Sequence, residues 1–596
     1  MKRKGFTLIE LLAVIVILSV IALITTPMIL NIIEETRKKA SIESVNGILD
    51  AAEKYEITSM LEGEETRRFE FPNEKLQYKG TKPESGTLII DEEGNTSITV
   101  LINGYCVRKR FNETTPSVIE EKNCTIEDSE LIYAERYKEE ILNGAYPEIK
   151  NELIPVTIES NGTVTYADIR KEWYSYKNKI WANAVILKDN VTHNVGEIIP
   201  ESDIKQYYVW IPRYKYELWN VNGENKYPNG TSSESAINIV FESKDKEVST
   251  GTENGEWLTH PAFTSFNTNG IWVGKYETSY DEETYTDSSK FLTTNPNYAA
   301  ATNASNIIIK PNVRSLTNKK VSEFYTLGRG INEGLNSHMM KNSEWGAVSY
   351  LTYSLFGKCT ETGCEEVYLN NINTGYLNST ATFTGQWQYS GSITGCSASS
   401  TSATVNSNQS SCSSGYAYNE ANNKASTTGN ISGIYDMSGG NWEYVMGVIK
   451  DASGNPISGR NSKYNSGFNG TYGCPTCDSD TSGLTSLTTG INFPTDTRYY
   501  DLYAPNSTEL GDDTWYKYEN GYLGDAIKEI AVSNTNSSGG NIGVWFSDNA
   551  CFPTIVYPWI VRGGGFFNST GAGIFVFGRD EGPADNVITF RAVLAI

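Results

Sequence analysis

The sequence predicts an α+β protein in which a long amino-terminal helix leads to a small antiparallel sheet and then to a large, irregular α+β region. Apolar residues run almost unbroken from Phe6 to about Ile33, and strand-like alternation fills the segment from Gly86 to Arg110. From about Asp128 the chain becomes rich in Tyr, Trp, Asn and Gly. A chain of 596 residues is too long for one core, so about two to four domains are expected.

The formal net charge of −22 argues against a nucleic-acid or anionic-membrane binder, because phosphate contacts need a basic face. No basic run in the sequence is long enough to supply such a face. The charge suits instead an exported protein that must stay soluble. No nucleic-acid partner is therefore expected.

The amino-terminal apolar run is long enough to cross a bilayer as one helix. Lys2, Arg3 and Lys4 precede it, so the positive-inside rule places this end in the cytoplasm and the rest of the chain outside. The run lacks the small-residue cleavage site that follows the shorter apolar core of an ordinary secretory signal. A plain membrane anchor is the simple alternative interpretation.

Glu10 is the charged residue within this apolar run. A carboxylate in hydrocarbon is costly, so Glu10 needs a cationic partner. A free α-amino group on Phe6 would supply one if the chain were cut after Gly5. In a filament of parallel, staggered helices, Glu10 of one subunit would then meet the amino terminus of its neighbour.

The segment KGFTLIE, from Lys4 to Glu10, resembles the class III leader of type IV prepilins and pseudopilins. The resemblance implies that prepilin peptidase cuts between Gly5 and Phe6, that Phe6 is N-methylated, and that the helix polymerises with other pilin subunits through the inner-membrane assembly machinery. Pro27 lies where pilin helices bend. The expected location is an extracellular pilus, reached from a single-pass cytoplasmic-membrane precursor.

After Pro27 the apolar residues adopt helical spacing among Glu, Arg, Lys and Asn, which predicts that the helix continues to about Tyr55. The segment from Gly86 to Arg110 predicts a hairpin that turns at residues 93–95. A pair formed by Cys106 and Cys124 would staple its edge loop, as in many pilin globular domains. Residues 6–127 therefore suffice for a small, complete pilin.

Eight of the nine cysteines fall into four close pairs, which predict disulfides in an exported chain. Zinc would need two such pairs, or a pair with histidines at matched spacing, and the three histidines are far apart. A redox role for the CPTC pair is a further alternative, although no thioredoxin-like βαβ pattern surrounds it. Sequence alone cannot fix the pairing, and Cys551 has no obvious partner. The predicted pairs are Cys106 with Cys124, Cys359 with Cys364, Cys396 with Cys412, and Cys474 with Cys477.

Short strands and turns are predicted through most of the central region. The segment from Ile154 to Ile169 predicts a hairpin around Asn161-Gly162. Helices are expected at about residues 129–142 and within residues 338–357. Residues 358–430 are rich in Ser, Thr, Asn and Gly, which predicts long loops pinned by disulfides.

The final third carries GIYDMSGGNWEYVMG from Gly433, WIVRGGGFF from Trp559, and FRAVLAI from Phe590 to the end. Together these motifs resemble the formylglycine-generating-enzyme-like branch of the C-type lectin fold. The resemblance extends from about Tyr207 to Ile596. It implies a compact, irregular α+β domain whose carboxy-terminal hairpin lies at the heart of the sheet.

Fold alone does not bring the enzyme's chemistry with it. The copper-dependent members need a pair of cysteines shortly after the RGG element, and residues 562–596 contain no cysteine. Iron-dependent relatives need clustered histidines, whereas His193, His260 and His338 are scattered along the sequence. We therefore expect no enzymatic activity and no catalytic cofactor.

Calcium is the cofactor that the resemblance leaves open. Family members can hold calcium near the WEW motif, where Asn441 and Glu443 would supply oxygen ligands. Gly440 stands where the family usually has Asn, which puts this site in doubt. Core packing with a structural hydrogen bond is the preferred role of Trp442, Glu443 and Tyr444.

The segment from Arg562 to Arg591 resembles the variable region of diversity-generating retroelement target proteins, which use the same lectin-like fold. Residues suited to a tight hairpin alternate there with chemically unrelated residues suited to a contact surface. Such systems randomise adenines in a template, so that an AAY codon can change to codons for a limited set of residues. That set does not include Lys, Gln, Glu, Met or Trp. Between Gly565 and Thr589, only Glu581 falls outside the set. An ordinary hairpin of an invariant domain is the alternative. The predicted ligand-binding residues are Phe566, Phe567, Asn568, Ser569, Ile574, Gly578, Arg579, Asp580, Asp585, Asn586, Val587, Ile588 and Thr589.

Two classes of function follow. The first is a pilus-borne adhesin whose lectin-like head binds an extracellular protein or glycan, at the tip or as a minor subunit because so large a head would crowd the shaft. The second is a structural pseudopilin with an invariant head, and an oxidase with a metal-loaded Cys551 is a remote third. The predicted segments are a leader at 1–5, an assembly helix at 6–58, a small β domain at 59–127, a linker and hairpin module at 128–200, and a lectin-like domain at 201–596 with its variable region at 541–596.

Overall fold

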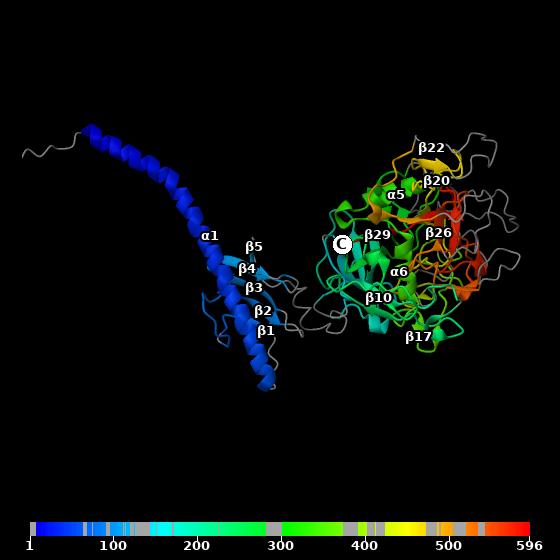
Figure 1. Ribbon diagram of the computed structural model, residues 1–596, viewed down its shortest axis with the longest axis horizontal. Helices are drawn as coiled ribbons and strands as arrows, with labels where there is room; N and C mark the ends of the chain where they lie inside the picture. The colour runs from blue at the N-terminus through cyan, green and yellow to red at the C-terminus, as the bar shows by residue number, and fades with distance from the viewer. Residues whose placement is uncertain are drawn as a thin grey trace, which may run out of the picture. The chain divides into compact units, whose positions relative to one another are not determined.

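The chain forms two compact units in the computed structural model (Figure 1). Unit 1 comprises Met1–Lys138 with Ile169–Lys171, and unit 2 comprises Glu139–Asp168 with Glu172–Ile596. The structure describes residues 8–62, 68–73, 75–90, 96–110, 113, 115–119, 124, 144–150, 152–169, 172–224, 226–281, 301–372, 391–401, 412, 423–472, 486–487, 490–504, 520–533 and 543–596.

Unit 1 packs the helix α1 (Leu8–Glu62) against an antiparallel sheet in the order β1-β2-β3-β4-β5 (Figure 1). Val45, Ile48, Leu49 and Ala52 recur at helical spacing and form the helix side of an apolar core, as predicted. The strands are β1 (Arg68–Phe71), β2 (Ser85–Ile90), β3 (Thr96–Ile102), β4 (Tyr105–Lys109) and β5 (Ser117–Ile119), and their core residues include Leu88, Ile98 and Val100.

Two local features of unit 1 differ from the sequence expectation. The helix continues past Tyr55 to Glu62, because no proline or glycine interrupts it before Gly63. The segment predicted as one hairpin forms three strands, with a second turn at Asn103-Gly104 between β3 and β4. Both turn residues have positive φ, 54° and 75°, a conformation for which the Asn-Gly pair is well suited. The predicted turn at 93–95 lies outside the described residues.

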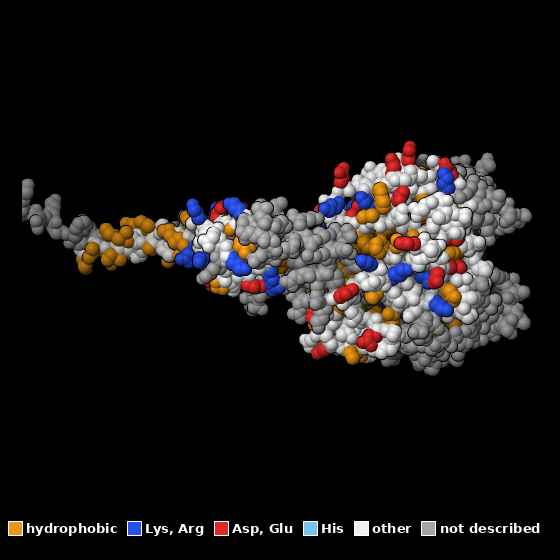
Figure 2. Space-filling model, turned by 90° about the horizontal axis from the view of Figure 1, so that it is seen from below, with side chains coloured by type: hydrophobic (Ala, Val, Ile, Leu, Met, Phe, Trp, Pro, Cys, Tyr) orange, Lys and Arg blue, Asp and Glu red, His pale blue; other side chains and the backbone are white. Residues whose placement is uncertain are grey.

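The amino-terminal half of α1 exposes a continuous series of apolar side chains (Figure 2). Their exposed fractions reach 86% at Leu8 and 79% at Leu23. In the part of the chain that the structure describes, no helix combines the length and hydropathy needed to cross a membrane. The predicted span from Phe6 to Ile33 is therefore not confirmed.

Unit 2 is built around a seven-stranded sheet in the order β16-β29-β13-β9-β8-β6-β7. The predicted hairpin at Asn161-Gly162 is confirmed as the antiparallel pair of β6 and β7, with Gly162 at φ 88°. The strands are β6 (Ile154–Ile158), β7 (Val164–Tyr166), β8 (Asn183–Leu187), β9 (Ile204–Pro212), β13 (Gly270–Gly274), β16 (His338–Met339) and β29 (Ala592–Leu594).

A second, five-stranded sheet carries the carboxy-terminal motifs. Its order is β23-β19-β26-β27, and β28 pairs in parallel with the start of β19. The strands are β19 (Trp442–Ile449), β23 (Asp501–Tyr503), β26 (Trp559–Arg562), β27 (Phe577–Asp580) and β28 (Ile588–Phe590). The GIYDMSGGNWEYVMG and WIVRGGGFF motifs thus meet as neighbouring strands.

Smaller elements complete unit 2. The helices are α5 (Val321–Gly330) and α6 (Asn342–Thr352), the latter within the predicted helical segment 338–357. One three-stranded sheet contains β10 (Tyr214–Glu217), β11 (Ile239–Phe241) and β12 (Trp257–Thr259), and another contains β20 (Ile457–Gly459), β21 (Gly470–Tyr472) and β22 (Ser486–Leu487). Two-stranded pairs join β14 (Ser279–Tyr280) with β15 (Ile307–Ile308), β17 (Cys359–Thr360) with β18 (Gly363–Cys364), and β24 (Ala531–Ser533) with β25 (Gly543–Val544).

The carboxy-terminal segment does not form the tight hairpin that its glycines predicted. Strands β26 and β27 are antiparallel, but residues 563–576 connect them as a long irregular loop. Gly563 and Gly564, at φ 82° and 74°, turn the chain away from β26, and buried Phe566 and Ile574 anchor the loop to the interior. Only β29 enters the large sheet, between β16 and β13.

Three of the four predicted disulfides are present among the described residues. They join Cys106 to Cys124, Cys359 to Cys364, and Cys396 to Cys412. Cys551 is buried and belongs to none of these bonds. Cys474 and Cys477 lie outside the described residues, as does the whole of the charged helix expected at 129–142.

Candidate functional site

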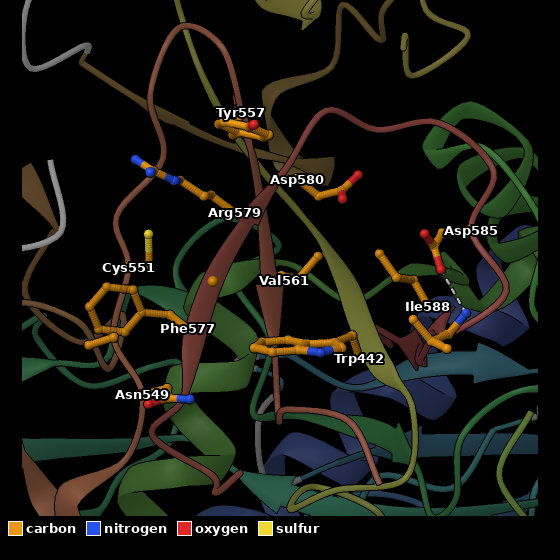
Figure 3. Close-up of a pocket in the computed structure, with 13 residues that line it drawn as sticks. Trp442, Asn549, Cys551, Tyr557, Val561, Phe577, Arg579, Asp580, Asp585 and Ile588 are labelled. Atoms are coloured by element: carbon orange, nitrogen blue, oxygen red, sulfur yellow. Dashed lines mark hydrogen bonds between the residues drawn. The ribbon is translucent and has the colours of Figure 1, made fainter. Parts of the chain in front are cut away.

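A cavity of about 550 Å³ opens on the five-stranded sheet of unit 2 (Figure 3). Six of the predicted ligand-binding residues line it, together with residues from β19, β26 and the segment before β26. The lining residues are Trp442, Asn549, Ala550, Cys551, Tyr557, Val561, Phe577, Gly578, Arg579, Asp580, Asp585, Val587 and Ile588.

Strand pairing brings the floor of this cavity together from three distant parts of the sequence. Val561 of β26 lies opposite Gly578 of β27, and Trp442 of β19 lies opposite Ile588 of β28. A side chain on residue 578 would begin 3.0 Å from the Trp442 ring and from Val561. Gly578 therefore leaves open the space above the Trp442 indole.

The cavity has two chemically different sides. Arg579 and Asp580 are adjacent on β27 and point to opposite sides of the strand (Figure 3). Arg579 lies 5.3 Å from the ring centre of Tyr557, on the side of Cys551. Asp580 points to the side of Asp585. The apolar floor of Val561 and Trp442 separates the cationic side from the acidic side.

Both carboxylates of the acidic side are held by neighbouring donors. Asp580 accepts hydrogen bonds from the hydroxyl of Tyr444 and, at 2.8 Å, from the backbone N–H of Gly582. Asp585 accepts a hydrogen bond from the backbone N–H of Val587 at 2.8 Å. Burial raises the pKa of Asp580 to about 7, with the negative charges of Glu581 and Asp585 adding to the rise, and burial also raises the pKa of Asp585.

The remaining predicted ligand-binding residues lie outside this cavity. Phe566 and Ile574, expected on an exposed contact surface, are buried with exposed fractions of 0% and 1%, because the long loop turns them inward. Thr589 is also buried. Asn568 accepts a hydrogen bond from the Gly565 N–H at 2.7 Å and so stabilises the loop itself. The others of this group are Phe567, Ser569 and Asn586, which are partly exposed.

The residues predicted as possible calcium ligands have other partners. Glu443 is fully buried and binds Arg591 through both carboxylate oxygens, at 2.5 and 3.1 Å. The backbone N–H and the side-chain amide of Asn441 both donate to Glu277. Across the described ranges, no group of three or more His, Cys, Asp or Glu residues is placed to hold a metal ion. The Glu443 carboxylate is thus already bound by a buried guanidinium.

The sequence did not predict seven of the lining residues, which are Trp442, Asn549, Ala550, Cys551, Tyr557, Val561 and Phe577. Trp442 was assigned to core packing, yet it is partly exposed and forms the cavity floor. Cys551 reaches the cavity because its N–H donates to the Phe577 carbonyl, which attaches its segment to the free edge of β27. Position within the expected variable region 541–596 was the only signal for Asn549, Cys551 and Tyr557.

The amino terminus matches a known family model. Residues 1–26 match the prokaryotic N-terminal methylation motif. The chain therefore has a type IV pilin-like prepilin start. Gly5 and Phe6 lie outside the described residues, and Glu10 is part of α1. No curated protein matches the chain.

Proposed function

We propose that the chain is a type IV pilin-like surface subunit whose unit 2 is a ligand-binding head. The cavity beside Trp442 carries this proposal, because it gathers six independently predicted residues onto one sheet. Its combination of apolar floor and a few charged groups is typical of a binding site. The ligand is an extracellular protein or glycan, and recognition supports adhesion.

Unit 1 supplies the assembly half of the proposal. The methylation motif supports cleavage by prepilin peptidase between Gly5 and Phe6, N-methylation of Phe6, and insertion by the pilus assembly machinery. The exposed apolar residues of α1 then pack against the helices of other subunits, with Glu10 facing the Phe6 amino group of a neighbour. A minor or tip position suits the large head.

A binding role is proposed for the head in preference to catalysis. The three histidines have separate structural contacts: His338 with Glu344 at 2.9 Å, His193 with Asp203 at 3.0 Å, and His260 among the rings of Tyr214 and Tyr216. These separate contacts do not form the clustered site that an iron-dependent relative needs. The lectin-like fold and its diversification by a retroelement are part of the same proposal.

Attachment of living cells tests the binding role. A strain carrying Trp442→Ala should still assemble filaments but should lose most of its attachment to surfaces that the parent strain colonises. Leu355→Ala is the matched control, because it removes an exposed apolar side chain elsewhere on unit 2. Equal attachment of the Trp442→Ala strain would contradict a ligand site at this cavity.

Diversification is tested by deep sequencing of codons 541–596 from one clonal culture. Substitutions should concentrate at the cavity positions Gly578, Arg579, Asp580, Asp585 and Ile588, beside an adenine-rich template copy of the segment. They should spare the buried Phe566. Uniform codons without a template copy would refute the retroelement hypothesis and leave an invariant head.

A further inference from the structure

The acidic side of the cavity contains two carboxyl groups that have no cationic partner among the described residues. Asp580 and Asp585 form no ion pair with any residue that the structure describes, and each accepts its hydrogen bonds through only one carboxylate oxygen, Oδ1. A carboxylate that is partly buried without a counterion bears part of the cost of removing a charge from water. A cation bound beside Asp580 and Asp585 would therefore stabilise their ionised forms.

Two basic side chains close to the acidic side in the sequence or in space, Arg579 and Arg460, have other partners. Arg579 points to the opposite side of β27 and lies over the Tyr557 ring (Figure 3). Arg460 binds Glu581 at 3.3 Å, so it neutralises the carboxylate that follows Asp580 in the sequence. The arrangement places cations around the acidic side but leaves Asp580 and Asp585 for a group from outside.

The wall beside these carboxylates is aromatic and apolar. The Trp442 indole, Val561 and Ile588 line the same cavity, and Gly578 keeps the space above the indole open. A hard metal ion prefers six or more oxygen ligands, which this wall does not offer. An organic cation matches both parts, since its charge pairs with carboxylates and its face packs on an indole.

We propose that the ligand of this cavity presents a guanidinium or ammonium group, which binds between Trp442 and the carboxylates of Asp580 and Asp585. This inference rests on the proposed binding role of unit 2. The cavity has a volume of about 550 Å³, which is much larger than one guanidinium or ammonium group. The group therefore belongs to a larger ligand, as an Arg or Lys side chain of a protein. Arg579, on the other side of the floor, then faces an acidic or polar part of the same ligand.

Calorimetric titration of the full chain in detergent tests the charge requirement with two probes of the same shape. Benzamidine, which is cationic, should bind at least about tenfold more tightly than neutral benzamide. Asp585→Asn should weaken benzamidine binding by about tenfold or more, whereas Asp189→Asn, which removes an exposed carboxylate outside the cavity, should leave it unchanged. Equal affinity for the two probes, or no benzamidine binding, would overturn the proposal.

A second variant guards against a folding defect in Asp585→Asn. Asp580→Asn keeps an acceptor oxygen for Tyr444 and Gly582 while removing the charge, so it should weaken benzamidine binding with little loss of thermal stability. Undiminished binding by both variants contradicts the proposal. Spermidine and a peptide with one Arg distinguish the source of the cation, and tighter binding of spermidine would contradict a protein ligand.

The attachment assay separates this inference from the proposed function. If Trp442→Ala abolishes attachment while Asp585→Asn and Asp580→Asn leave attachment and benzamidine binding intact, the head binds its ligand without a cation. If Trp442→Ala leaves attachment intact, the binding role itself fails. Loss of both attachment and benzamidine binding in the two Asp variants is the result expected here.

Discussion

Unit 1 and unit 2 differ in the kinds of polar side chain that are buried in their cores. The buried polar side chains described in unit 1 are hydroxyl groups, namely Ser41, Ser44, Thr87, Thr96, Ser97 and Thr99. Unit 2 buries ionisable groups as well, among them Arg213, Lys275, Glu277, Asp436, Glu443, Glu529, Arg562 and Arg591. The core of unit 1 therefore contains only neutral polar groups among those described, whereas the core of unit 2 also contains acidic and basic side chains.

The difference follows from how each unit satisfies its backbone. Unit 1 is one helix on one regular sheet, whose ladders pair most backbone groups. Unit 2 buries long irregular segments whose carbonyls lack such partners. Lys275 donates to the carbonyls of Ile431 and Gly433 at 2.6 and 2.9 Å, and Arg591 donates to those of Gly274 and Tyr435 at 2.8 and 3.0 Å. Buried basic side chains thus supply hydrogen-bond donors in place of strand partners.

The largest effect is expected from removing one of these basic side chains. Arg591→Met leaves the Glu443 carboxylate buried without its cation and two carbonyls without their donor. We expect unit 2 to lose about 3–5 kcal/mol of its free energy of unfolding. Hydrogen exchange measured by mass spectrometry should show faster exchange in β13, β19 and β29 and no change in β2, β3 and β4.

Two further variants sharpen this test. Adding Glu443→Gln to Arg591→Met removes the unpaired charge and should restore part of the lost stability. Arg498→Met breaks an exposed ion pair with Asp496 and should have a much smaller effect, because solvent already screens that pair. If Arg498→Met and Arg591→Met lowered the free energy of unfolding of unit 2 equally, burial of the Arg591 ion pair would not be the source of its contribution to stability.

A smaller effect, confined to the other unit, is expected from the apolar core. Leu88 of β2 is fully buried in the core of unit 1. Leu88→Ala should lower the free energy of unfolding of unit 1 by about 3 kcal/mol, through lost burial and a cavity. Leu88→Ile, which conserves volume, should cost less than about 1.5 kcal/mol. The free energy of unfolding of unit 1 is measured by denaturant titration, with hydrogen exchange in β2–β4 as the signal. Equal losses of stability for both variants would contradict an apolar origin of the stability of unit 1.

Much of unit 1 could be predicted from the sequence because its signals are local. Val45, Ile48 and Ala52 show the helical period, and the alternation in β2 and β3 shows the strand period. The extra turn at Asn103-Gly104 was also present as a local signal and was overlooked. Close spacing likewise predicted the pair of Cys106 and Cys124.

Unit 2 could be predicted only where its contacts are local. The β6–β7 hairpin and α6 were found, but pairing of Trp442 with Ile588 joins residues that no local pattern connects. The same holds for the ion pair of Glu443 with Arg591. In the last segment, residue types predicted which positions form the scaffold and which bind a ligand. They could not show that the side chain of Phe566 points into the interior. The cavity residues Gly578 to Asp580 were identified, whereas their neighbour Tyr557 was not.

The smallest effect expected is a dependence of unit 2 on pH, which unit 1 should not share. Burial raises the pKa of Glu529 to about 7, and three donors, from Tyr216, Tyr350 and Gly524, bind its Oε2 atom. The unfolded chain loses this proton near pH 4.3, so the stabilisation is complete below that pH and is lost as the pH rises through about 7. Between pH 5 and pH 8 this loss should amount to about 2.5 kcal/mol, which lowers the thermal midpoint of unit 2 by roughly 3 °C. Glu529→Gln keeps the acceptor oxygen and should reduce this dependence in a calorimetric scan, while other carboxyl groups with a raised pKa, such as Asp580, keep their share. A midpoint that rises with pH, or a slope that Glu529→Gln leaves unchanged, would show that the buried carboxyl is already ionised at pH 5.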